Sequence, residues 1–128
     1  VNKAIQRSGS ENKIRKHTRL NTDKGNALIY FDQLVYVRTS EIDSRDKTAF
    51  LANGTSLQLK NISFEKLISL LPSDSFCRIN KKELIALNSV LYFSNDQITI
   101  NAFHQSEKPL VLTLGETYRA DFISKANQ

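Results

Sequence analysis

The stretch from residue 76 to residue 90, FCRINKKELIALNSV, constrains the fold more than any other part of the chain. Phe76 and Arg78 alternate with Cys77 and Ile79, and this alternation predicts a strand with one buried face. The alternation stops at an amide followed by two lysines, after which an apolar run resumes. A strand, a basic corner and a return to the core together predict a corner that is held rigidly.

Asn80, Lys81 and Lys82 form this corner, and two interpretations of it compete. A solvated turn is the simpler one, because lysine pairs are common on any protein surface. A nucleic-acid contact is the alternative, since lysine donates to phosphate oxygens as a point charge and an amide presents a donor and an acceptor together to a base edge. Charge alone favours the solvated turn.

Basic residues gather at the start of the chain. The 128 residues include 18 Lys and Arg and 13 Asp and Glu, and residues 1–25 hold seven of the basic and two of the acidic ones. The rest of the chain holds eleven of each and is neutral. The isoelectric point of about 9.4 therefore describes the leading segment. If the folded part binds nucleic acid, its few basic side chains have to be clustered.

Length and composition predict one domain preceded by a linker. Residues 1–25 are rich in charge, Ser and Gly and poor in apolar side chains, so we expect a basic linker or arm there, with His17 in solvent, and a folded domain over residues 26–128. The arm is either a passive tether or a source of sequence-independent attraction to phosphate. Because Val1 is not methionine, we expect the chain to be an excised fragment. No apolar run approaches the roughly 18 residues of a membrane helix, which favours a soluble domain, and a single cysteine suits a reducing cytoplasm.

Reactive side chains are few and scattered. Cys77 is the single cysteine, so no internal disulfide forms, and with His17 and His104 it makes no recognisable metal or cysteine-protease site. Four glycines form no phosphate-binding loop, and the acidic residues have no metal-ligand spacing. We therefore expect no enzyme activity, no metal, no cofactor and no small-molecule substrate, with His104 solvated in a polar loop.

Short apolar runs separated by turn signals fill the chain from residue 27 onward. Strands are predicted at 27–31, 34–37, 47–52, 56–60, 76–79, 89–93, 97–102 and 110–114. Asn53-Gly54 is the strongest hairpin signal, and Asn95-Asp96 predicts a second hairpin. Apolar residues spaced at three and four positions behind the candidate N-cap Ser63 predict a short helix, and Tyr118, Phe122 and Ala126 predict a terminal one. The domain is thus predominantly β.

The stretch from residue 76 to residue 90 resembles the LytTR DNA-binding domain, whose usual pattern there is Phe-x-Arg-Ile-His-Arg-Ser-Tyr-Ile-Val-Asn-Leu-x-x-Ile. The positions that keep the family's residue type are Phe76, Arg78, Ile79, Ile85, Leu87 and Val90. The positions that differ are Asn80 for histidine, Lys81 for arginine or asparagine, Lys82 for serine and Ala86 for a second asparagine.

The end of the chain carries a second part of the resemblance. Residues 114–119, Leu-Gly-Glu-Thr-Tyr-Arg, are similar to the family's Leu-Ser-Arg-Arg-Tyr, and Phe122 follows Tyr118 at the family's spacing of four. Gly115 stands where serine is usual, and Glu116 and Thr117 stand where two arginines are usual. The resemblance spans residues 27–126.

This resemblance implies an elongated antiparallel multi-sheet fold, of three packed sheets, with one short internal helix and a C-terminal helix. It also implies sequence-specific binding of double-stranded DNA for bacterial transcription regulation, as the output domain of a two-component response regulator. A receiver domain or a membrane segment would then precede the arm, and two copies would pair on the DNA. The alternative is a protein-interaction or dimerisation module on the same fold, favoured by the neutral domain charge and by Glu116.

The resemblance also places the DNA-facing loops. They lie around Arg45 to Lys47, around Asn80 to Lys82, and at the approach to the terminal helix, where Arg119 is the nearest cation. Within this frame we expect Lys81 to contact a base with Asn80 as its amide neighbour. Lys82 and Lys47 are expected to hold phosphates. Arg78 is either part of this surface or a structural ion-pair residue.

Overall fold

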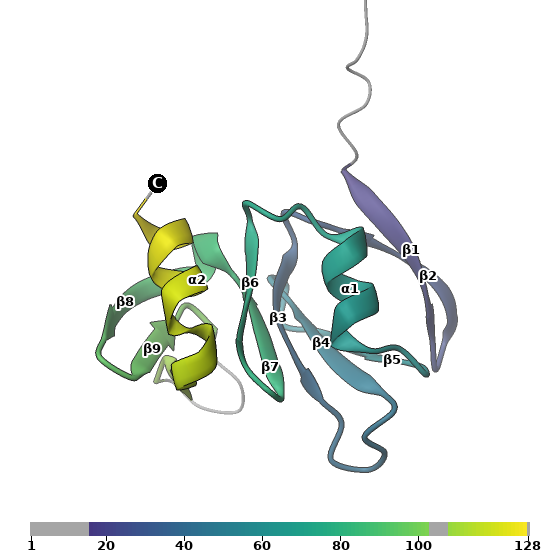
Figure 1. Cartoon of the computed structure of the whole chain (residues 1–128). Helices are drawn as coiled ribbons and strands as arrows, with labels where there is room; N and C mark the ends of the chain where they lie inside the picture. Colours follow the sequence, from purple (N-terminus) through teal and green to yellow (C-terminus); the bar gives the residue numbers. More distant parts are fainter. Residues whose placement is uncertain (1–15, 103–107, 128) are drawn as a thin grey trace, which may run out of the picture.

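The computed structural model describes residues 16–102 and 108–127. Figure 1 shows an elongated molecule in which a larger antiparallel sheet with one short helix stands beside a smaller sheet with a second helix. The larger sheet contains β1 (His17–Thr22), β2 (Gly25–Tyr30), β3 (Leu34–Thr39), β4 (Lys47–Leu51), β5 (Ser56–Leu59), β6 (Phe76–Asn80) and β7 (Glu83–Ala86). The smaller sheet contains β8 (Val90–Ser94), β9 (Gln97–Ile100) and β10 (Leu110–Thr113), and the helices are α1 (Phe64–Leu70) and α2 (Glu116–Ala126). The predicted fold class is confirmed.

The larger sheet has the strand order β2-β1-β5-β4-β3-β7-β6, and the smaller one has the order β10-β9-β8. β1 meets β5 at a single residue pair, Thr22 with Leu59, whereas β4 and β5 share four pairs. The β1–β2 hairpin is therefore joined to its neighbours at a corner. Because this corner is hydrogen-bonded, the described residues form two sheets and not the three that the resemblance implies.

Two clusters of buried side chains lie on opposite faces of the β6–β7 hairpin. Phe76 and Leu84 belong to the cluster that α1 covers, whereas Cys77, Ile79 and Ile85 belong to the cluster shared with the smaller sheet and α2. The prediction of one buried face for β6 is wrong, since helix and sheet cover the strand from both sides. This burial fixes the hairpin whose tip carries the two lysines.

Local signals in the sequence correspond to turns and caps in the structure. The Ser63 side chain accepts a hydrogen bond from the Lys66 N–H at 3.1 Å and caps α1, which ends just before Pro72. Gly54 has φ +90° in the β4–β5 turn, a conformation that glycine adopts without steric cost. Asn95 has φ +38° in the β8–β9 turn. The predicted turns and helices therefore follow from a few residues each.

The predicted domain boundary at residue 26 falls inside the β1–β2 hairpin, so the folded part begins earlier. Thr18, Leu20 and Thr22 point inward and are buried, although two of the three are polar. His17, expected in solvent, is half-buried with its ring 5.1 Å from that of Tyr30. The described residues form ten strands, whereas eight were predicted, and the two additional strands are β1 and β7. The predictions for residues 1–15 and for His104 lie outside the described residues.

Candidate nucleic-acid interface

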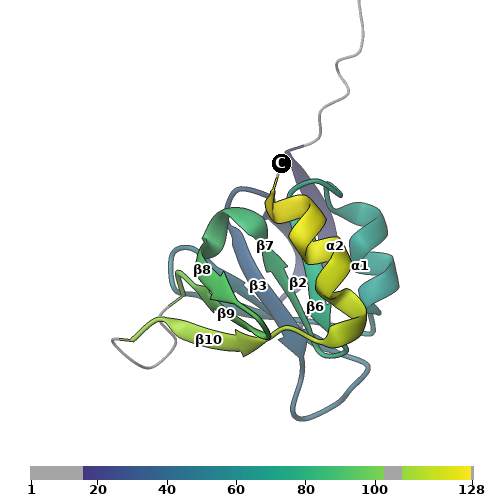
Figure 2. The same cartoon turned by 60° about the vertical axis from the view of Figure 1, so that its left-hand side comes forward.

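The loops that the resemblance assigns to DNA lie at one end of the molecule. In Figures 1 and 2 the β3–β4 loop, the β6–β7 turn and the start of α2 all lie at the lower end. Backbone hydrogen bonds connect them, since the Thr39 N–H donates to the Lys82 carbonyl at 2.9 Å and the Gly115 N–H donates to the Ile79 carbonyl at 2.7 Å. We call residues 40–46, 80–82 and 114–119 the loop end.

The Asn80 side chain closes the β6–β7 turn. Its Nδ2 donates to Glu83 Oε1 and to the Thr113 carbonyl, both at 2.8 Å, and its Oδ1 accepts from the Lys82 N–H at 2.8 Å. Both amide hydrogens and one lone pair are thus used within the protein. These bonds give Asn80 a structural role, tying the turn to the end of β10, in place of the predicted base contact.

Arg78 also stabilises this turn through hydrogen bonds. Its Nε and Nη2 donate to the carbonyl oxygens of two turn residues at 3.3 and 2.9 Å, and its Nη1 donates to Glu65 Oε2 at 3.2 Å. The guanidinium carbon lies 4.8 Å from the centre of the Phe64 ring and 5.4 Å from that of Tyr118. Arg78 therefore joins the turn to both helices, which agrees with the structural ion-pair interpretation.

Lys81 and Lys82 are exposed at the tip of the β6–β7 hairpin. Their backbone groups are fixed, because the Lys81 carbonyl accepts from Arg78 and the Lys82 N–H and carbonyl bind Asn80 and Thr39. Neither ammonium forms an ion pair with another described residue. The two charges are thus available to a partner, on a backbone that does not have to become ordered when a partner binds.

Arg45 and Lys47, predicted on one DNA-facing loop, are placed very differently. The Arg45 side chain is 77% exposed, and its Nη2 lies 2.9 Å from Asp43 Oδ2. Hydrogen bonds from Arg45 lower the pKa of Asp43 to about 2. Lys47 is buried, its Nζ donates to the Ser44 carbonyl at 2.9 Å, and burial lowers the pKa of its ammonium. Lys47 is therefore not the exposed phosphate clamp that was predicted.

Arg119 and Glu116 lie on the first two turns of α2, at the loop end. Both side chains are exposed, and neither forms an ion pair within the part of the chain that the structure describes. Gly115, which precedes them, lies close to β6, since a Cβ at this position would be 3.3 Å from Tyr118 Cδ2 and 3.4 Å from the Ile79 carbonyl oxygen. The cation Arg119 and the acid Glu116 thus share one exposed surface.

A polar network behind the turn was missed by sequence reasoning. The Tyr36 hydroxyl donates to Glu83 Oε2 at 2.8 Å, and burial followed by the Glu83 charge raises the pKa of Tyr36. Arg38 is paired in register with Glu83, yet its buried Nε has no hydrogen-bond partner among the described residues. Its guanidinium instead lies 5.4 Å from the centre of the Phe50 ring. Only the register of β3 with β7 brings these side chains together, so no local pattern predicts them.

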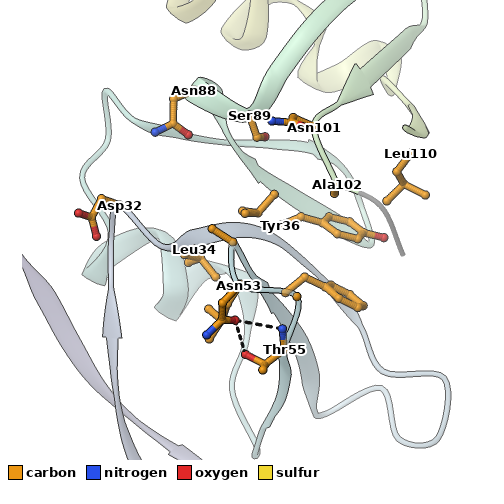
Figure 3. A pocket seen from close by; sticks show the side chains of 15 residues that line it. Asp32, Leu34, Tyr36, Asn53, Thr55, Asn88, Ser89, Asn101, Ala102 and Leu110 are labelled. Carbon is orange, nitrogen blue, oxygen red and sulfur yellow. Dashed lines mark hydrogen bonds between the residues drawn. The ribbon is translucent and has the colours of Figure 1, made fainter. Parts of the chain in front are cut away.

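A hollow of about 470 Å³ lies between the two sheets, away from the predicted DNA-binding residues. Figure 3 shows Tyr36, Asn88 and Asn101 at its walls, and Asn53 Oδ1 accepting from the Thr55 N–H at 3.0 Å. Among the described residues that line it, Asp32 is the one ionisable carboxylate. Within the described part of the chain, this lining holds no acid–base pair and no nucleophile with an adjacent base.

Three further observations concern metal ligands, membrane helices and the cysteine among the described residues. Within residues 16–102 and 108–127, no three His, Cys, Asp or Glu side chains are grouped to hold a metal ion. The same residues contain no helix of the length and hydrophobicity needed to cross a membrane. Cys77 is buried, and burial followed by the charge of Asp121 raises the pKa of its thiol to about 12.

Comparisons with known proteins place the fold. No family model and no curated protein matches the chain. Among solved structures, the chain is similar to the LytTr DNA-binding domain of a protein from Bacillus cereus that is described as a methyl-accepting/DNA response regulator. The match has a TM-score of 0.65 and 15% sequence identity, and it covers 89% of this chain and 99% of the other. The chain therefore has the LytTR fold.

Proposed function

We propose that this LytTR-fold domain binds double-stranded DNA through the loop end and regulates bacterial transcription as the output domain of a two-component response regulator. The observation that carries the proposal is the pair of exposed lysines, Lys81 and Lys82, on a turn that is hydrogen-bonded to β3 and β10. The fold of a DNA-binding domain supports it. The zero summed charge of residues 26–128 is compatible with it, because these cations are clustered.

Lys81 and Lys82 take different roles in this proposal. Lys81 is the second residue of the turn and extends from its tip, so it is assigned the base edge in a major groove. Lys82 and Arg119, together with Arg45 once it leaves Asp43, are assigned to phosphates, which fix the orientation of the domain on the duplex. The base contact supplies selectivity, and the phosphate contacts supply most of the affinity.

The rigid turn gives these contacts their energetic advantage. Immobilising a long side chain on binding costs roughly 0.5–1.5 kcal/mol, and ordering a mobile loop adds to this cost. Here the backbone of residues 80–82 is already fixed by Arg78, Asn80 and Thr39. Only the two lysine side chains have to become ordered, so more of the electrostatic attraction remains as affinity.

The wider setting is part of the same proposal. A receiver domain or a membrane segment precedes the domain, the protein acts in the cytoplasm, and two copies pair on the DNA. The protein with the similar structure is described as a methyl-accepting/DNA response regulator, and this description supports the response-regulator part of the proposal. In this proposal the domain acts by binding alone.

Competition binding to a selected duplex and its single-base variants tests the proposal. Lys81→Ala is expected to cost about 1–3 kcal/mol on the best site and to flatten the preference at one or two bases. Lys82→Ala is expected to weaken binding to all duplex sequences alike. It is also expected to lower the salt slope, which is the slope of log affinity against log salt concentration, by about one. A Lys81→Ala, Lys82→Ala double variant with unchanged affinity and selectivity would refute the proposed surface.

A protein-interaction module is the second candidate, and one observation favours it. β8 is an edge strand of the smaller sheet, and Leu91, Tyr92 and Phe93 along it are 49%, 66% and 40% exposed. An exposed apolar edge strand is suited to pairing with another chain. Sedimentation of the wild-type protein without DNA separates the candidates, because a module of this kind associates without nucleic acid and shows no salt-dependent duplex binding.

A further inference from the structure

A second basic feature lies beside the loop end, where the β3–β4 loop meets the segment between β5 and α1. A hollow of about 390 Å³ opens there, and the described residues that line it include three cations, Arg45, Lys47 and Lys66, and no acidic residue. Asn61 and two serines complete the polar part of the lining. A concave surface with cations and neutral donors, and no carboxylate on its wall, has the chemistry of a site for an anion.

The walls of this hollow are fixed relative to each other. The Ile62 N–H donates to the Arg45 carbonyl at 2.9 Å, and the Asn61 N–H donates to Asp46 Oδ1 at 2.8 Å. Asp46 also accepts from Lys60 Nζ at 2.8 Å, so this carboxylate is already satisfied and its charge compensated. Asp46 is itself buried. The charge of Asp46, which lies between Arg45 and Lys47 in the chain, is thus compensated by Lys60.

The three cations contribute in different ways. Lys66 is exposed on α1 and forms no ion pair with another described residue. Arg45 is exposed but is held by Asp43 across 2.9 Å, a surface pair of the kind that exchanges partners at little cost. Lys47 lies at the base, where its ammonium donates to the Ser44 carbonyl and adds positive charge from within. Lys66 is therefore the donor most readily available to a ligand.

We propose that this hollow seats one backbone phosphate of a DNA duplex, with Lys66 and Arg45 as its donors. The proposal rests on the proposed function, since it requires a duplex on the loop end. Figures 1 and 2 show the start of α1 and the β3–β4 loop at the same lower end as the β6–β7 turn. A duplex across the lysine corner is thereby held at a second point, away from Lys81 and Lys82.

The salt dependence of duplex binding by the complete chain tests whether the hollow binds a phosphate. Each phosphate contact contributes about 0.9 to the slope of log affinity against log salt, so Lys66→Gln is expected to lower the slope by about 0.9 and to weaken binding about eightfold at 0.1 M salt. The loss is expected to be the same for a selected and a random-sequence duplex, because a phosphate carries no sequence information. Lys66→Arg keeps the charge and serves as the matched control, with an expected slope near that of the wild type.

Three results overturn or redirect the inference. An unchanged slope in Lys66→Gln, in a wild type that does bind DNA, refutes the seat and leaves the proposed function standing. Absence of duplex binding by the wild type refutes both. A melting temperature that rises with inorganic phosphate at constant ionic strength, in the wild type and not in Lys66→Gln, without any change in duplex binding, would assign the hollow to a free anion and refute the DNA contact.

Discussion

Replacement of Asn80, the last residue of β6, by alanine separates a structural role of this side chain from a base-reading role. The side chain makes three hydrogen bonds within the protein, two of them to neutral groups and one to the carboxylate of Glu83. A neutral hydrogen bond contributes about 0.5–1.5 kcal/mol net and a bond to a charged group about 1.5–3 kcal/mol. Because Asn80 is only partly buried and water can replace part of these bonds, we expect the lower end of the sum, a loss of about 2–3 kcal/mol in the free energy of unfolding.

Urea and thermal unfolding, followed by circular dichroism, measure this loss. For a domain of this size about 1 kcal/mol corresponds to roughly 3–5 °C in Tm, so Tm is expected to fall by about 6–15 °C. Asn88→Ala is the matched control, since Asn88 is exposed, makes no side-chain hydrogen bond to a described residue and lines the hollow shown in Figure 3. Its expected change is within about 0.5 kcal/mol.

Duplex binding by the same variant completes the test. Below its melting temperature Asn80→Ala is expected to bind a selected and a random duplex more weakly by similar factors, because the lysines of a looser turn have to be ordered on binding. A Tm within about 2 °C of the wild type would refute the structural role of the Asn80 side chain. If that result came with a flattened preference at one base, Asn80 would be a base reader after all.

Three further predictions concern the core, the arm and the start of α2. Phe76→Ala is expected to cost about 3–5 kcal/mol in urea unfolding, since the side chain is 5% exposed within the α1 cluster, and a Tm shift of a degree or two would mean that β6 is wrongly registered. Removal of residues 1–15, which leaves β1 intact, is expected to weaken selected and random duplexes equally, and a selective loss would show that the arm reads sequence. Glu116→Arg is expected to raise the salt slope by up to about 0.9, with Glu116→Gln as control, and an unchanged slope would place this turn of α2 outside the contact.

The elements with a local cause were predictable from the sequence. Three predicted features each depend on residues within a few positions, and each is present. They are the turn at Asn53-Gly54, the N-cap at Ser63 and the apolar spacing of α1. β1 was missed because two of its three inward side chains are threonines, so its burial is invisible to an apolar pattern. Alternation in β6 suggested one buried face because Arg78, which lies partly buried between two aromatic rings, looks like a solvent-facing residue in the sequence.

The exposed basic corner was predictable from the sequence, whereas the partners of its side chains were not. Lys81 and Lys82 were assigned from a corner between two apolar runs, and both are exposed there. The roles of Asn80 and Lys47 depend on partners that the chain brings close only on folding: Thr113 is 33 residues from Asn80, and Lys47 lies 5.3 Å from the centre of the Phe64 ring. A residue type shows what a side chain is able to bind, whereas the fold determines which of its groups remain free.

The same distinction bears on the proposed attraction of DNA by a chain whose charges after residue 25 sum to zero. Several acids of the lower end already have partners: Asp43 binds Arg45, Asp46 binds Lys60 and Glu65 binds Arg78. Four exposed cations, Lys66, Lys81, Lys82 and Arg119, form no ion pair with another described residue. Three of them, Lys66, Lys82 and Arg119, are proposed to hold phosphates, and three phosphate contacts correspond to a slope of about 2.7 in log affinity against log salt, although the summed charge after residue 25 is zero. Ion pairing, which the summed charge ignores, thus compensates Asp43, Asp46 and Glu65 and leaves these four cations available.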